Sequence, residues 1–152
     1  RHSRADAVTL CAEIRRRRPD TVFGADLIAG FPTETDEMAE NSLRLIEDCG
    51  LTHLHVFPFS ARPGTPAARM PQVPGDLRKA RAARLRQAGE AAFRRHLDDQ
   101  VGRIAHVLVE EPGFGRSEHY APVRLGHAAE ASEIAAVRVA GVRDGELIAA
   151  AA

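Results

Sequence analysis

The sequence predicts a parallel α/β fold that is followed by a small all-β barrel. Two short apolar runs, residues 21–29 and 51–59, each give way to Gly or Pro and then to small polar residues. The stretch between them has the apolar period of a helix and is long enough to connect two parallel strands. Beyond residue 100, short β-like runs are separated by turn residues. We therefore expect a domain boundary between residues 1–100 and residues 101–152.

The first predicted helix covers residues 3–18. Ser3, followed by Asp6, is a typical N-cap, and the arginines of the last turn suit the negative end of the helix dipole. Pro19 ends this helix. Residues 21–29 are then expected to form a buried strand.

The second predicted helix covers residues 36–49, with Thr33 or Thr35 as its cap and Gly50 as its C-terminal stop. Residues 51–59 are expected to form the second strand. The loops that leave parallel strands gather at the carboxyl edge of the sheet. Residues 30–35 and 58–65 are therefore the place to look for function.

Residues 60–75 contain four prolines and two glycines, which predicts a loop. Asp76 is expected to cap a long helix that runs to about Gln100. The arginines of this helix are interpreted as a solvated face. In the tail, short strands are expected over residues 104–109, 120–125, 134–142 and 146–149, as in a small barrel of the oligonucleotide-binding kind.

Composition sets limits on the class of protein. Hydrophobic residues make up 44% and charged residues 28%, and the formal net charge is zero, so overall charge points to neither nucleic acid nor membrane. No apolar run approaches the roughly 20 residues that span a bilayer, and no signal-peptide pattern is present, so we expect a cytoplasmic protein. Because the chain opens on Arg1 rather than Met, we expect a segment of a longer protein.

Three residue patterns have both a functional and a structural interpretation. Gly30 allows a backbone to approach a ligand closely, but Gly and Pro at a strand end are also ordinary turn residues. His53 and His55 share a strand face but lack a third metal ligand, so structural histidines are favoured. Arg62 can hold a carboxylate or phosphate bidentately, or it can anchor its loop. Cys11 and Cys49 are interpreted as buried thiols rather than a disulfide or metal site.

Several segments together resemble the carboxyl-terminal half of the radical S-adenosylmethionine methylthiotransferases. They are Asp26-Leu-Ile-Ala-Gly-Phe-Pro-Thr-Glu-Thr35, Leu51-Thr-His-Leu-His-Val-Phe-Pro-Phe-Ser60 and Ala61-Arg-Pro-Gly-Thr-Pro-Ala67. The His-Val-Phe-Pro-Phe-Ser version is most similar to the branch that modifies threonylcarbamoyladenosine at tRNA position 37. Tyr120-Ala-Pro-Val-Arg-Leu125 is similar to the TRAM-type RNA-binding barrel of these enzymes.

The resemblance implies a fold and an activity. Residues 1–100 would be the last part of a partial TIM-type barrel with a long closing helix, and residues 101–152 a TRAM-like, OB-like barrel. The implied enzyme is a transferase that adds a methylthio group at C2 of N6-threonylcarbamoyladenosine in tRNA. In this family one 4Fe-4S cluster cleaves S-adenosylmethionine and a second cluster supplies the sulfur.

The sequence departs from the family pattern at the clusters. The Cys-x-x-x-Cys-x-x-Cys motif and the amino-terminal cysteines that hold the clusters are absent. We therefore expect part of a tRNA-modifying enzyme that is inert by itself. Its expected partners are tRNA, S-adenosylmethionine and the missing amino-terminal half.

Site residues follow from the resemblance by matching position. Those expected near S-adenosylmethionine or the substrate are Gly30, Phe31, Pro32, Glu34, Phe57, Pro58, Ser60 and Arg62. Those expected to contact RNA are Tyr120 and Arg124 in the tail and, if the Arg-rich helix takes part, Arg78, Arg81 and Arg84. No general acid, general base, nucleophile or metal ligand is predicted.

Two alternative functions stay open. One is a non-enzymatic RNA-binding module that uses the Arg-rich helix and the β tail, in which Phe114 and Tyr120 are candidates for stacking on bases. The other is a small α/β ligand-binding protein without an RNA role. The salt dependence of tRNA binding discriminates between them.

Overall fold

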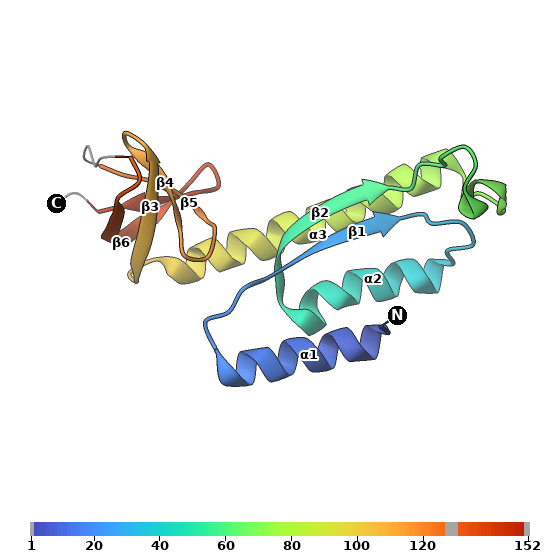
Figure 1. Ribbon diagram of the computed structural model, residues 1–152, viewed down its shortest axis with the longest axis horizontal. Coiled ribbons are helices and arrows are strands. Elements are labelled where there is room, and N and C mark those ends of the chain that lie inside the picture. Colours follow the sequence, from blue (N-terminus) through green and yellow to red (C-terminus); the bar gives the residue numbers. More distant parts are fainter. Residues whose placement is uncertain (1, 127–130, 151–152) are drawn as a thin grey trace. The chain divides into compact units, whose positions relative to one another are not determined.

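The computed structural model describes residues 2–126 and 131–150. The chain divides into two compact units, Arg1–Ala92 and Phe93–Ala152 (Figure 1). Each is described by itself below.

The first unit contains two parallel strands with helices on one side of them (Figure 1). In chain order its elements are α1 (Arg4–Arg17), β1 (Phe23–Ala29), α2 (Asp36–Cys49), β2 (Leu51–Pro58), the short 3-10 helix η1 (Pro66–Arg69) and α3 (Gly75–Gln100). Residues 93–100 of α3 belong to the second unit.

Local sequence signals explain the helix ends. Ser3 and Asp6 form the reciprocal capping box of α1, and the Thr35 hydroxyl accepts a hydrogen bond from the Met38 amide at the start of α2. Gly50 ends α2 with a φ of 60°, a left-handed conformation that glycine adopts at little cost. Thr35, not Thr33, is therefore the cap.

The two faces of the β1–β2 pair differ. Ala25, Leu27 and Ala29 on β1 lie beside Leu54, Val56 and Pro58 on β2, and most of these residues pack into a core with apolar residues of the helices. The opposite face carries Asp26 and Ile28 beside His55 and Phe57. Ile28 and Phe57 are 56% and 51% exposed, so among the described residues this second face is not covered by a packed layer.

The second unit is a closed barrel of mixed topology. Its strands are β3 (Ile104–Glu111), β4 (Phe114–Ser117), β5 (Pro122–Arg124), β6 (Ile134–Arg143) and β7 (Glu146–Ala149), in the spatial order β3-β4-β5-β7-β6. Only β5 and β7 pair in parallel within the described barrel. Alternate residues of β3 point inward, and Leu97 at the end of α3 completes the core.

The architecture confirms the predicted fold class: a parallel βα portion of the kind that ends a TIM-type barrel, followed by a TRAM-like closed barrel. No helix of the described residues is long and apolar enough to cross a membrane.

Several local expectations were wrong. The strand β4 was not predicted, because Phe114–Ser117 is only four residues long and contains a glycine. Residues 66–69 form η1, with Pro66 at its first position and Thr65 as cap, inside the segment expected to be loop. Helix α3 begins at Gly75, which places Asp76 in its first turn instead of at its cap. Tyr120 lies outside β5, in a turn with a φ of 61°.

Candidate functional site

The loops that follow β1 and β2 leave the same edge of the sheet. Ala29 and Pro58 are register partners, and the Phe59 amide donates to the Ala29 carbonyl at 2.8 Å. The Phe31 and Phe59 rings then meet edge to face with centroids 5.2 Å apart. The predicted juxtaposition of residues 30–35 and 58–65 is therefore present where the two loops leave their strands.

Glu34 is the centre of the first loop. Its carboxylate Oε2 accepts from the Gly30 amide at 2.9 Å and from Arg81 Nη1 at 2.8 Å. Arg81 also donates to the Glu34 carbonyl and to Asp36 Oδ1, the latter at 2.6 Å. These bonds fix the loop to α3.

Arg81 is buried, so the interpretation of all α3 arginines as a solvated face was wrong at this position. The Arg81 and Glu34 side chains are 7% and 10% exposed. Burial alone would lower the pKa of Arg81, but the hydrogen bonds to Asp36 and Glu34 outweigh it, so the pKa is raised and the group stays charged. A side chain so enclosed offers little surface to an RNA phosphate.

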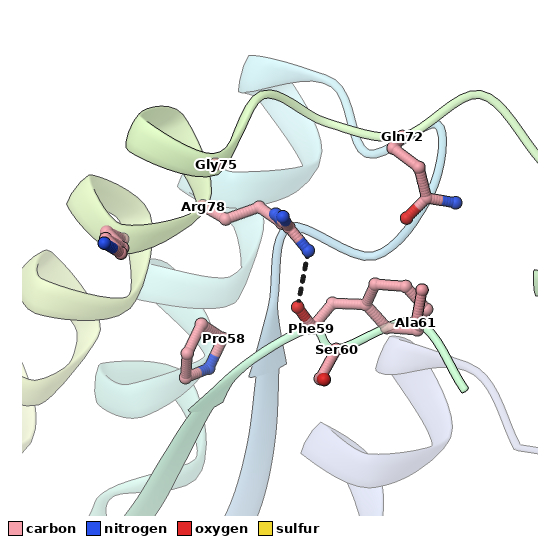
Figure 2. Close-up of a pocket in the computed structure, with 8 residues that line it drawn as sticks. Pro58, Phe59, Ser60, Ala61, Gln72, Gly75 and Arg78 are labelled. Atoms are coloured by element: carbon pink, nitrogen blue, oxygen red, sulfur yellow. Dashed lines mark hydrogen bonds between the residues drawn. The ribbon is translucent and has the colours of Figure 1, made fainter. Parts of the chain in front are cut away.

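Position 30 requires glycine because the Arg78 side chain approaches its backbone closely. The φ of Gly30 is 72°, and a Cβ built on it would overlap with Cγ of Arg78. The space that a ligand was expected to use beside this glycine is therefore taken by the stem of Arg78. The guanidinium of Arg78 reaches on to the Phe59 carbonyl, to which Nη1 donates at 2.7 Å (Figure 2).

A pocket of about 480 Å³ opens beside this contact. It lies between the end of β2 and the start of α3, with Arg78 and Gln72 facing the strand end from the other side (Figure 2). Its lining residues are Pro58, Phe59, Ser60, Ala61, Gln72, Gly75, Arg78 and Lys79.

The structure brings together only some of the residues that were expected near S-adenosylmethionine or the substrate. Pro58 and Ser60 line the pocket, whereas Pro32 is fully buried. Phe57 lies on the uncovered sheet face, and Phe31 packs on Phe59 while remaining 45% exposed.

Arg62 is an exposed loop residue outside the pocket lining. Its carbonyl accepts from the Thr65 hydroxyl at 2.8 Å, which shapes the loop that leads to η1. The structure thus gives the backbone of Arg62 a local role, and its guanidinium is exposed.

Sequence reasoning missed three pocket residues, Gln72, Gly75 and Lys79. The available signal was topological: a helix that follows a parallel strand and packs back on it starts at the strand's carboxyl edge. The first turns of α3 therefore had to meet the loop that follows β2.

The barrel presents aromatic and basic side chains together at two places. Tyr120 is 66% exposed, and the Arg116 guanidinium lies 4.6 Å from its ring centre. Arg124 lies over Phe114 at 5.2 Å and pairs with Glu146 at 2.9 Å. Arg116 was not singled out from the sequence, because its position beside Tyr120 depends on the turn between β4 and β5.

Most of this chain aligns in sequence with relatives of known function. A threonylcarbamoyladenosine tRNA methylthiotransferase from Rickettsia prowazekii is 43% identical over 95% of the chain, which corresponds to 34% of that protein. The tRNA-2-methylthio-N(6)-dimethylallyladenosine synthase of Cereibacter sphaeroides is 35% identical over 91% of the chain and 34% of its own length. The synthase of Methylococcus capsulatus is 44% identical over 72% of the chain and 24% of its length. The chain belongs to the methylthiotransferase family.

The chain spans about a third of the length of the relatives that match it most fully. A comparison with protein-family models finds no match.

The two cysteines of the chain do not fit an iron–sulfur cluster. They come from α1 and α2 and contact each other: burial, followed by the hydrogen bond with Cys11 that favours the protonated thiol, raises the pKa of Cys49 to about 11. Cluster ligands are thiolates, so a buried thiol of raised pKa is a poor donor. Within the described residues, no three His, Cys, Asp or Glu side chains are grouped to hold a metal ion.

Proposed function

We propose that this chain is part of a tRNA methylthiotransferase that acts on threonylcarbamoyladenosine at tRNA position 37. The observation that carries the proposal is the 43% identity to the Rickettsia enzyme across 95% of the chain. Two dimethylallyladenosine synthases that match a similar share, 91%, are 35% and 34% identical, which favours the threonylcarbamoyl branch.

The arrangement at the strand ends supports a positioning role in this reaction. Parallel α/β folds bind ligands at the carboxyl edge of their strands, where this chain has a pocket. S-adenosylmethionine, when bound, would supply the radical and the methyl group. Ile28 and Phe57 offer it an apolar sheet face, and Pro58 and Ser60 form the adjoining rim.

The second unit supports RNA binding. TRAM-like and OB-like barrels bind nucleic acid through exposed aromatic and basic side chains on a rigid sheet. Tyr120 and Arg116 form one such pair, and Arg124 over Phe114 forms a second; the two arginines are ion-paired with Glu110 at 3.2 Å and with Glu146 at 2.9 Å, respectively. The Tyr120 ring is 66% exposed. We propose that the first pair makes the stronger contact with the tRNA.

The clusters implied by the family are not assigned to residues of this chain, because Cys11 and Cys49 do not fit them. We therefore propose that the chain alone does not cleave S-adenosylmethionine. Anaerobic reconstitution with iron and sulfide should leave it without the absorption of about four iron atoms per chain, and without 5′-deoxyadenosine as product. Detection of both would show that the chain is catalytically competent by itself.

The proposed substrate is tested by binding. The chain should bind an anticodon stem-loop that contains adenosine 37 more tightly than a hairpin with the same stem and a four-nucleotide loop. Fluorescence anisotropy at low salt measures both affinities. Equal affinity for the two RNAs, or none for either, would contradict recognition of the anticodon loop.

A second candidate function is RNA binding without catalysis. The poor fit of the cysteines to a cluster favours it. In that case the barrel carries the whole activity, and S-adenosylmethionine should have no measurable affinity for the chain in isothermal titration calorimetry, with or without tRNA.

A further inference from the structure

The pocket at the end of β2 combines cations with neutral hydrogen-bonding groups. Arg78 and Lys79 supply the charge, and Ser60 and Gln72 supply a hydroxyl and an amide. The walls at Pro58 and Phe59 are apolar. Its volume of about 480 Å³ lies within the roughly 300–1,000 Å³ of small-molecule sites.

Three arginines on α3 differ in how their charge is balanced. Arg81 pairs with Glu34 and Asp36, and Arg84 pairs with Glu40 at 2.6 Å. Arg78 instead donates to a neutral carbonyl, that of Phe59. Among the residues that the structure describes, no carboxylate forms an ion pair with Arg78. Of these three arginines, the pocket-lining Arg78 is thus the one without a carboxylate partner in the described part of the chain.

The position of Arg78 is fixed before any ligand arrives. Its Cβ and Cγ pack on Gly30, and its Nη1 is held by the Phe59 carbonyl (Figure 2). That bond uses one of the five N–H donors of a guanidinium. A half-buried guanidinium held at one nitrogen loses little further freedom when it binds an anion, which favours binding.

We propose that this pocket binds the carboxylate of the threonylcarbamoyl group on the substrate adenosine, through Arg78 and Lys79. The inference rests on the proposed function and deepens it. A threonine substituent carries a carboxylate and a hydroxyl, which match the two cations and the Ser60 and Gln72 side chains. A dimethylallyl group has no polar atom and would leave these groups without a ligand, so the pocket discriminates between the two substrates.

An RNA phosphate offers the same anionic chemistry, and the experiment separates the two sources. Three anticodon stem-loops are compared: one with threonylcarbamoyladenosine 37, one with its methyl ester, and one with unmodified adenosine. Binding to the wild-type chain and to Arg78→Gln, Lys79→Gln and Arg84→Gln variants is measured by anisotropy. Arg84 is the matched control, since it lies on the same helix but outside the pocket. Circular dichroism verifies that each variant is folded.

The wild-type chain should bind the stem-loop that carries the free carboxylate about tenfold more tightly than either of the other two RNAs, as expected for a charge-assisted hydrogen bond. Arg78→Gln should abolish the preference while changing affinity for the unmodified RNA less than twofold, and Lys79→Gln should weaken the preference. Arg84→Gln should preserve it.

An equal loss of affinity for all three RNAs in Arg78→Gln would overturn the proposal in favour of a phosphate contact. RNA binding without any preference in the wild-type chain would overturn the carboxylate site and leave the proposed function standing. Failure to bind any of the RNAs would instead reject the proposed function.

Discussion

Arg81 Nη1 lies 2.8 Å from Glu34 Oε2, and this almost fully enclosed ion pair joins the loop after β1 to the second turn of α3. The same carboxylate also receives the Gly30 amide. Glu34 therefore organises the strand end on which the proposed substrate pocket depends, because Gly30 packs on Arg78.

Glu34→Gln should destabilise the chain by about 2–3 kcal/mol, because among the described residues it leaves the buried Arg81 charge with the exposed Asp36 as its one remaining carboxylate partner. The measurement is urea unfolding followed by circular dichroism. Glu40→Gln is the control, since it breaks the exposed pair with Arg84 and should cost less than about 1 kcal/mol. Similar costs for both variants would mean that the buried pair contributes no more than a surface pair.

Gly30→Ala should cost about 1–3 kcal/mol more than Gly64→Ala. Both glycines have positive φ values, 72° and 82°, but a Cβ at Gly64 meets nothing within 4 Å whereas one at Gly30 meets Arg78. Subtracting the two free energies of unfolding removes the shared backbone strain. A difference near zero would show that Arg78 moves away without cost.

The pH dependence of stability should carry a signature of Cys49. Burial and the Cys11 contact raise its pKa from 9.0 to about 11, so between these pH values the unfolded chain loses the proton first. The free energy of unfolding should therefore be fully retained below pH 9 and fall as the pH rises toward 11. Urea unfolding of the wild type and of Cys49→Ala should show a steeper decline in the wild type. Parallel declines would contradict a raised pKa.

Tyr120→Ala should weaken tRNA binding by about tenfold while leaving the unfolding transition nearly unchanged. The ring is 66% exposed and is stacked by Arg116, so it is available to a base and contributes little to the core. Leu108→Ala is a suitable control, because Leu108 is another exposed apolar residue of the barrel, at 48%. An equal effect of the two substitutions on affinity would argue against stacking at Tyr120.

Elements with strong local signals could be predicted from the sequence. The helix Asp36–Cys49 follows from its period, its Thr35 cap and Gly50, and the parallel pairing follows from the apolar strands that flank it. The convergence of residues 30–35 and 58–65 follows from the same topology. These features follow from local sequence signals and from the parallel pairing that a strand–helix–strand unit imposes.

Features that depend on distant partners could not be predicted. Arg81 has the same local pattern as Arg84, and only the position of Glu34 on the opposing loop makes one buried and the other exposed. The contact between Cys11 and Cys49 likewise arises from the packing of α1 on α2. The short strand Phe114–Ser117 is held by pairing on both sides rather than by its own sequence.

The central claim, that this chain recognises tRNA as part of a methylthiotransferase, is tested most directly by the affinity for threonylcarbamoyladenosine-containing tRNA across a salt series. A barrel that contacts several phosphates should give a linear fall of log K with log salt, with a slope of about −2 or steeper. The affinity should exceed that for the unmodified tRNA at every salt concentration. No detectable tRNA binding at about 50 mM salt, where such contacts are strong, would contradict the claim.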